Sequence, residues 1–73
     1  MQLRTAQRRS VFVNGERTET GASSLGELVT QLGHEQDAVA TAVNGEFVPR
    51  PSRAATPLSE DDRVEIVAPR QGG

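Results

Sequence analysis

The pair Asn-Gly occurs twice in this chain of 73 residues, each time between two short segments with strand-like composition. A type I′ turn needs positive φ at both central residues, and Asn-Gly is the pair that adopts this conformation most readily. The flanking segments are residues 11–13 and 16–20 around the first pair, and 39–43 and 46–48 around the second. Each Asn-Gly pair therefore predicts a tight β-hairpin. Pro49 ends the second hairpin, because proline cannot donate a ladder hydrogen bond.

A short helix is predicted between the two hairpins. Ser24 and Glu27 form the Ser-x-x-Glu pattern of a capping box at its start. The apolar residues that follow have the i, i+3, i+4, i+7 spacing of one buried stripe: Leu25, Leu28, Val29 and Leu32. Gly33 then supplies the left-handed conformation that commonly ends a helix. Because so short a helix is not stable alone in water, we expect it to pack against a sheet.

The remainder of the chain predicts one more strand. Residues 49–61 contain three prolines and predict an irregular connection, with Leu58 as its anchor in the core. Residues 63–67 alternate between polar and apolar, which predicts a half-buried strand with Val64 and Ile66 facing inward. A single helix must then cover one face of a mixed sheet. We predict an α+β fold of the β-grasp (ubiquitin-like) type, a sheet of about five strands on one short helix, with the first and last strands adjacent at its centre.

Two polar features could suggest a metal site. His34 is the only histidine and has no carboxylate or cysteine cluster at ligand spacing, so a solvated side chain is the favoured interpretation. Glu60, Asp61 and Asp62 are consecutive, and an exposed turn is favoured over a Mg²⁺ site. We predict neither a metal nor a cofactor in this chain.

Composition narrows the classes of function. The chain has no cysteine and no apolar run longer than three residues, so it predicts no disulfide and no membrane span, and it fits a reducing, cytoplasmic location. Beyond residue 10, five arginines face ten acidic residues, a net charge of −5, and no Tyr or Trp is present. Such a surface does not favour nucleic acid. We expect residues 1–9, rich in arginine, to be a disordered extension rather than an interaction arm, and residues 10–69 to form the domain.

The sequence ends in Gly72 and Gly73. Without Cβ atoms, these residues are narrow and adopt backbone conformations closed to other residues. We expect residues 70–73 to be a flexible tail that threads a narrow channel and presents its carboxylate to a partner. The alternative is a frayed end or a cloning remnant.

The sequence from residue 11 to Gly73 resembles the ThiS family of sulfur carriers for thiamin biosynthesis. The most specific similarity lies in three segments: Ala-Val-Asn-Gly-Glu-Phe-Val-Pro-Arg at 42–50, Arg-Val-Glu-Ile-Val at 63–67, and Gln-Gly-Gly at 71–73. Residues 1–9 precede the usual start of the family. Asp61-Asp62 replaces the family's common Gly-Asp, and we expect the turn to survive because Asp tolerates positive φ.

This resemblance implies a protein co-substrate rather than an enzyme. A ThiF-like adenylyltransferase would use ATP to adenylate the carboxylate of Gly73, and Gly72 would meet a steric requirement of the channel. A cysteine desulfurase or persulfide relay would supply the sulfur of a thiocarboxylate, and a ThiG-like thiazole synthase would accept it. Three alternatives remain open: a MoaD-like sulfur carrier for molybdopterin synthesis, a ubiquitin-like modifier that forms isopeptide bonds, and a β-grasp interaction module with an accidental diglycine.

Overall fold

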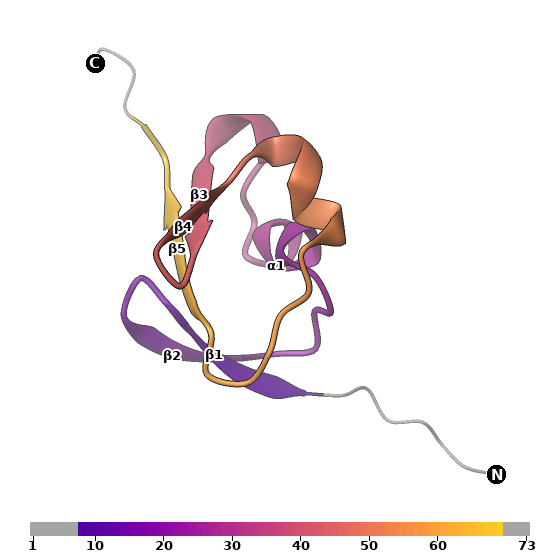
Figure 1. Ribbon diagram of the computed structural model, residues 1–73, viewed down its shortest axis with the longest axis vertical. Coiled ribbons are helices and arrows are strands. Elements are labelled where there is room, and N and C mark those ends of the chain that lie inside the picture. Colours follow the sequence, from indigo (N-terminus) through magenta and orange to yellow (C-terminus); the bar gives the residue numbers. More distant parts are fainter. Residues whose placement is uncertain (1–7, 70–73) are drawn as a thin grey trace, which may run out of the picture.

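Five strands form one mixed sheet, and an α-helix lies against one of its faces (Figure 1). The computed structural model describes residues 8–69. The strands are β1 (Arg9–Val13), β2 (Glu16–Thr20), β3 (Ala40–Val43), β4 (Glu46–Val48) and β5 (Arg63–Val67). The helix is α1 (Leu25–Gln31), and two 3₁₀ segments are η1 (Gln36–Ala38) and η2 (Arg50–Ala55).

The first and last strands lie side by side at the centre of this sheet. The strand order is β2-β1-β5-β3-β4, in which β1 and β5 are parallel and every other neighbouring pair is antiparallel. Phe12 is opposite Arg63 in the parallel pair, and Thr41 is opposite Ile66 on the other side of β5. The arrangement is that of a β-grasp fold, as predicted.

Both Asn-Gly pairs form the predicted two-residue turns. The φ angles are 52° at Asn14 and 86° at Gly15, and 51° at Asn44 and 86° at Gly45. Positive φ at both central positions defines the type I′ turn, whose twist matches that of the flanking strands. The turn before β5 also behaves as expected, because Asp61 adopts a φ of 67°.

The core lies between α1 and the inner face of the sheet. Leu25, Leu28 and Val29 from the helix are fully buried, and Val64 and Ile66 from β5 are buried opposite them, as predicted. Leu58 anchors the connection with 5% of its surface exposed. The prediction for Leu32 is wrong, because 37% of this residue is exposed. Leu32 is the C-cap, and the chain turns away directly after it, so the stripe ends one turn earlier than the spacing indicated.

The capping box of α1 differs from the prediction in one detail. The Oγ of Ser24 accepts a hydrogen bond from the backbone N–H of Glu27 at 3.1 Å. The carboxylate of Glu27 accepts at 2.9 Å from the backbone N–H of Ser23 instead of Ser24. The return bond is therefore displaced by one residue, and both bonds still satisfy free backbone donors at the helix start. At the other end, Gly33 has a φ of 88°, as predicted for a helix stop.

A buried arginine holds the connection to the sheet. Arg53 is 3% exposed, and its guanidinium donates to Thr41 Oγ1 at 3.0 Å and to the Val39 carbonyl at 2.7 Å. It also donates to the carbonyl and side-chain oxygens of Gln36 at 2.8 and 2.9 Å. A buried cation needs such acceptors in place of water. This role could not be predicted, because an arginine between prolines is typical of an exposed loop.

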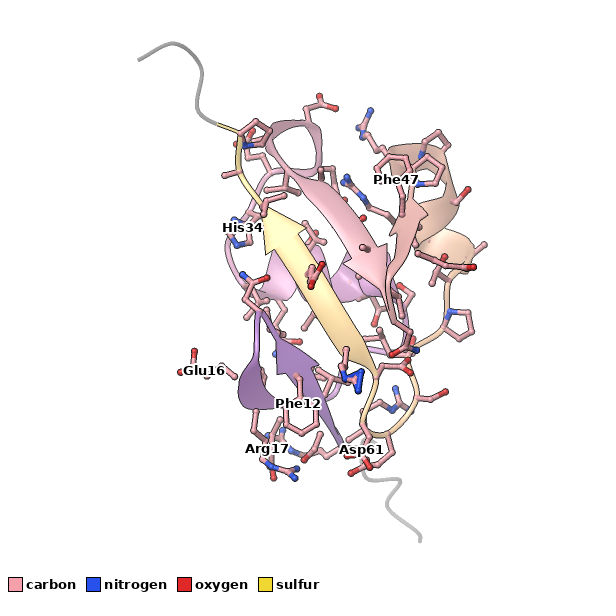
Figure 2. The ribbon with its side chains drawn as sticks, turned by 60° about the vertical axis from the view of Figure 1, so that its left-hand side comes forward. Phe12, Glu16, Arg17, His34, Phe47 and Asp61 are labelled. Atoms are coloured by element: carbon pink, nitrogen blue, oxygen red, sulfur yellow. The ribbon has the colours of Figure 1, made fainter. Side chains whose placement is uncertain are left out.

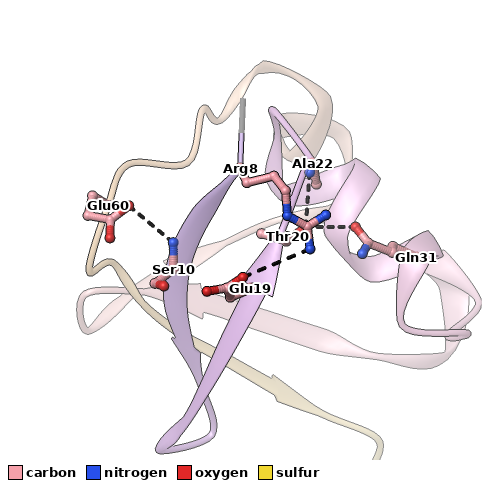
Figure 3. Close-up of polar contacts among 7 residues, drawn as sticks. All are labelled: Arg8, Ser10, Glu19, Thr20, Ala22, Gln31 and Glu60. Atoms are coloured by element: carbon pink, nitrogen blue, oxygen red, sulfur yellow. Dashed lines mark hydrogen bonds and ion pairs between the residues drawn. The ribbon is translucent and has the colours of Figure 1, made fainter. Parts of the chain in front are cut away.

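The start of β1 is held from two sides (Figure 3). The backbone N–H of Ser10 donates to Glu60 at 3.1 Å, and Arg8 lies 4.0 Å from the carboxylate of Glu19. On the neighbouring strand, Thr20 Oγ1 donates to Gln31 of the helix at 2.7 Å. Arg9 is the first residue of β1, and residues 1–7 of the expected extension lie outside the described residues.

Candidate functional site: the last strand and the open face of the sheet

The last strand connects the centre of the fold to the predicted functional end of the chain. β5 is paired with β1 on one side and with β3 on the other. After Val67 come Ala68 and Pro69, both exposed, at the end of the sheet opposite to the start of β1 (Figure 1). Gly72 and Gly73, the predicted site residues, lie outside the described residues.

The face of the sheet away from α1 is not covered by any element among residues 8–69 (Figure 2). Side chains alternate between the two faces along a strand. Because Val64 and Ile66 point into the core, their neighbours Glu65 and Val67 point outward, and Val67 is 56% exposed. The outward residues fall into an apolar and a charged part.

The apolar part, which we call the apolar patch, consists of Ala40, Ala42, Phe47 and Val67. The strand registers bring these residues together: Ala40 is opposite Val67, and Ala42 is opposite Phe47. Phe47 is the most exposed large apolar side chain among the described residues, at 68% (Figure 2). An exposed aromatic beside small apolar residues is a feature of protein-binding surfaces. Since Val67 is the last residue of β5, the patch directly adjoins the root of the tail.

The charged part lies at the other end of the same face. Arg17 is opposite Phe12, which is opposite Arg63 in the parallel pair. The guanidinium carbon of Arg17 is 5.2 Å from the centre of the Phe12 ring, within the range of a cation–π interaction. Glu65 lies between this part and the apolar patch, opposite Ala42. The open face thus presents polar groups of both signs around an apolar area, which suits a protein partner.

Two turn asparagines, which sequence reasoning assigned only to turns, also bind β5. The side chain of Asn14 accepts a hydrogen bond from the Ile66 N–H at 2.9 Å and donates to the Ile66 carbonyl at 3.1 Å. The side chain of Asn44 accepts from the Arg63 N–H at 2.9 Å and donates to Asp62 at 3.0 Å. Both turns have the sequence Val-Asn-Gly-Glu, and this repeat is the sequence feature that relates the two asparagines.

Other candidate groups do not assemble into a reactive site. His34 is exposed, as predicted, and the carboxylates of Glu60 and Asp62 accept backbone hydrogen bonds from Ser10 and Ser59. Within residues 8–69, no cluster of three or more His, Asp or Glu side chains could hold a metal ion. In the same part of the chain, no helix has the length and apolar character needed to cross a bilayer.

An open depression lies on the helix side of the molecule, lined by α1 and η2 together with Gln36 and the segment after β2. Its wall includes Glu27, Arg50 and Arg53, of which Arg53 already makes four hydrogen bonds to the protein. Over the described residues, every buried side-chain polar atom has a partner. The depression therefore offers no unsatisfied group that points to a ligand.

Comparison with known proteins agrees with this architecture. The family model described as "ThiS family" matches residues 3–73. The crystal structure of the thiamine biosynthesis protein ThiS from Geobacter metallireducens is 31% identical, covers 88% of this chain and 99% of its own, and gives a TM-score of 0.72. A solution structure of a thiamine biosynthesis protein from the same organism is 34% identical over 88% of this chain and 87% of its own, with a TM-score of 0.71.

No curated protein sequence gives a significant match. The family model nevertheless spans nearly the whole chain, and the solved structures share its fold over 88% of it. The chain belongs to the ThiS family, whose members are small β-grasp sulfur carriers and not enzymes.

Proposed function

We propose that this protein carries sulfur for thiamine biosynthesis as a thiocarboxylate on Gly73. A carboxylate is a poor electrophile, so a ThiF-like adenylyltransferase first transfers AMP from ATP to the Gly73 carboxylate and releases pyrophosphate. The terminal sulfur of a persulfide, supplied by a cysteine desulfurase or a relay protein, then displaces AMP. A thiol cleaves the resulting S–S bond and is itself oxidised to a disulfide, which leaves the thiocarboxylate on the carrier.

The observation that carries this proposal is the position of β5. It lies at the centre of the sheet, is paired on both sides, and ends next to the apolar patch. A partner that docks on the patch thereby receives the chain end that follows β5. Docking then keeps the tail close to the partner's reactive site, and holding reactants near one another in this way is a large source of rate enhancement.

The partners follow from the same chemistry. The adenylyltransferase supplies the ATP site, and a ThiG-like thiazole synthase takes the sulfur into the thiazole ring. The carrier contributes the apolar patch for recognition and the diglycine end for access, so it needs no cofactor of its own. We place it in the cytoplasm because a thiocarboxylate and its persulfide donor require a reducing environment.

The experiment is pyrophosphate exchange with the purified cognate adenylyltransferase. Deleting Gly73 leaves a carboxylate but shortens the reach by about 3.5 Å. A misplacement of even about 1 Å costs roughly 100-fold in a positioned reaction, so exchange should be lost. Gly72→Val keeps the length, adds a branched side chain where only bare backbone fits, and should also lose exchange. Both variants should fold like the parent by circular dichroism.

An alanine appended after Gly73 is the matched test in the opposite direction, because it moves the carboxylate beyond the reactive position. Normal exchange by the deleted or the extended chain would refute the proposed function. Formation of thiazole, and not of molybdopterin, with the matching synthase separates this role from that of a MoaD-like carrier.

A further inference from the structure

The two turn asparagines hold β5 at opposite ends. Asn44 binds the beginning of the strand, where its backbone N–H donates to the Arg63 carbonyl at 2.7 Å and its side chain accepts from the Arg63 N–H at 2.9 Å. Asn14 binds near the end of the strand, where its carboxamide makes both hydrogen bonds of Ile66 on that side. Ile66 is three residues before Pro69, at the root of the tail.

The carboxamide of Asn14 takes the place of a peptide group that β1 does not provide. The parallel ladder between β1 and β5 pairs Phe12 with Arg63 and Val13 with Val64, and the backbone N–H of Asn14 donates to the Val64 carbonyl at 2.8 Å. The chain then turns away at Gly15 into β2. Among residues 8–69, the side chain of Asn14 is the partner of the Ile66 N–H and carbonyl on the β1 side, and its loss would leave both groups unpaired there.

We propose that Asn14 is a positioning residue for the tail. Its carboxamide holds the backbone of Ile66, the next-to-last residue of β5, so that the chain leaves the domain in one direction. This inference rests on the proposed sulfur-carrier function. If the end of β5 frays, those residues must be ordered again each time the carboxylate reaches the adenylyltransferase. Fixing one residue's backbone costs about 1–2 kcal/mol, which corresponds to a factor of about 5–30 in rate.

Asn14 lies outside the apolar patch, so its effect on the order of β5 can be measured apart from partner docking. Asn14 lies in the turn between β1 and β2, whereas the apolar patch comes from β3, β4 and β5. Loss of its carboxamide leaves Phe47 and Val67 in place for the partner. We therefore expect loss of this carboxamide to lower kcat for adenylation and to leave the KM for the carrier unchanged.

The test compares Asn14→Gly with Asn44→Gly in full-length protein. Glycine keeps the positive φ of each turn and removes the side-chain hydrogen bonds, which for Asn44 include the bond to Asp62 just before β5. We expect Asn14→Gly to lower kcat of pyrophosphate exchange by about 5- to 30-fold and to speed amide hydrogen exchange at Ile66. Asn44→Gly, whose bonds lie at the far end of β5, should leave kcat unchanged. Asn14→Asp keeps the acceptor for the Ile66 N–H but loses the donor, so its kcat should fall between those of the parent and Asn14→Gly.

Three results would overturn the inference. An unchanged kcat for Asn14→Gly would show that order at Ile66 does not matter for delivery. An equal loss in the two glycine variants would indicate general destabilisation. A raised KM with unaltered exchange at Ile66 would make Asn14 a partner contact. A parent protein that supports no pyrophosphate exchange refutes the proposed function instead, while amide exchange at Ile66 still tests the hydrogen bonds themselves.

Discussion

The two faces of the sheet use alternate residues of the same strands for different purposes. On the covered face, Val11, Val64 and Ile66 pack against α1 with at most 5% of their surface exposed. On the open face, Phe47 is 68% and Val67 is 56% exposed, and Val67 adjoins the root of the tail. Stability depends on residues of the covered face, and we expect recognition to depend on residues of the open face. Substitutions on the two faces should therefore have opposite effects on folding and on partner binding.

The largest effect is expected on the covered face. Leu28 is fully buried, and Leu28→Ala removes three carbons from the helix–sheet core. We expect the free energy of unfolding to fall by about 2–5 kcal/mol, which is a large part of the stability of so small a domain. Urea denaturation measures this loss, with Val67→Ala on the open face as the control. A loss below about 1 kcal/mol for Leu28→Ala would mean that the covered face is not the main source of stability.

A smaller but clear loss of stability is expected at Arg53. Arg53→Met keeps most of the side-chain volume but leaves Thr41 and the carbonyl of Val39 without their donor. Each buried acceptor left unpaired costs about 1–3 kcal/mol, so we expect a loss of about 2–3 kcal/mol in thermal or urea unfolding. The control is Arg50→Met in the same segment. Arg50 is exposed and paired with Asp37 at 2.9 Å, a type of contact worth at most about 1 kcal/mol. Equal losses in both variants would contradict the structural role of Arg53.

On the open face, Phe47→Ala should weaken partner binding and leave the fold unchanged. Truncating a central aromatic anchor costs about 2 kcal/mol or more, so the Kd for the adenylyltransferase should rise about 30-fold. Titration calorimetry measures this change, and Phe47→Leu should restore part of the affinity because it keeps apolar area. An unaltered Kd would remove the apolar patch from the recognition surface.

The smallest effect is expected for the salt dependence of association with the adenylyltransferase. The chain beyond residue 10 has a net charge of −5, which should steer it toward a basic surface on the adenylyltransferase. Because salt screens exposed charges, we expect the association rate to fall several-fold between about 50 and 500 mM salt. Stopped-flow measurements test this expectation. A rate independent of salt would leave the apolar patch as the sole basis of recognition.

The covered face could be predicted from the sequence because periodic patterns encode it. Positive φ at Asn14 and Asn44 and the burial of Leu28 follow from local rules that depend only on neighbouring residues. The same rule predicted burial of Leu32 and was wrong, because periodicity does not show where a short helix ends relative to the sheet. For the open face, the alternation of polar and apolar residues indicates only which residues point outward. It does not show which strands are neighbours in the sheet.

Long-range polar contacts could not be predicted for a related reason. The bonds from Asn14 to Ile66 span 52 positions, and those from Arg53 to Thr41 and Gln36 depend on the path of an irregular connection. The residue type reveals the capacity to donate or accept, whereas the partner is set by the tertiary fold. The role that we propose for Gly73 rests on family membership and on the position of β5, because this residue lies outside the described part of the chain.

We propose that the end of the chain is the chemical site and that the domain delivers it to the partner enzymes. The most direct measurement is the intact mass of the protein after co-expression with its cognate adenylyltransferase and sulfur donor. Replacement of one carboxylate oxygen by sulfur raises the mass by about 16 Da. We predict this increase for the parent protein and its absence after deletion of Gly73. An unmodified parent protein, or a mass increase that survives the deletion, would rule out a thiocarboxylate on Gly73.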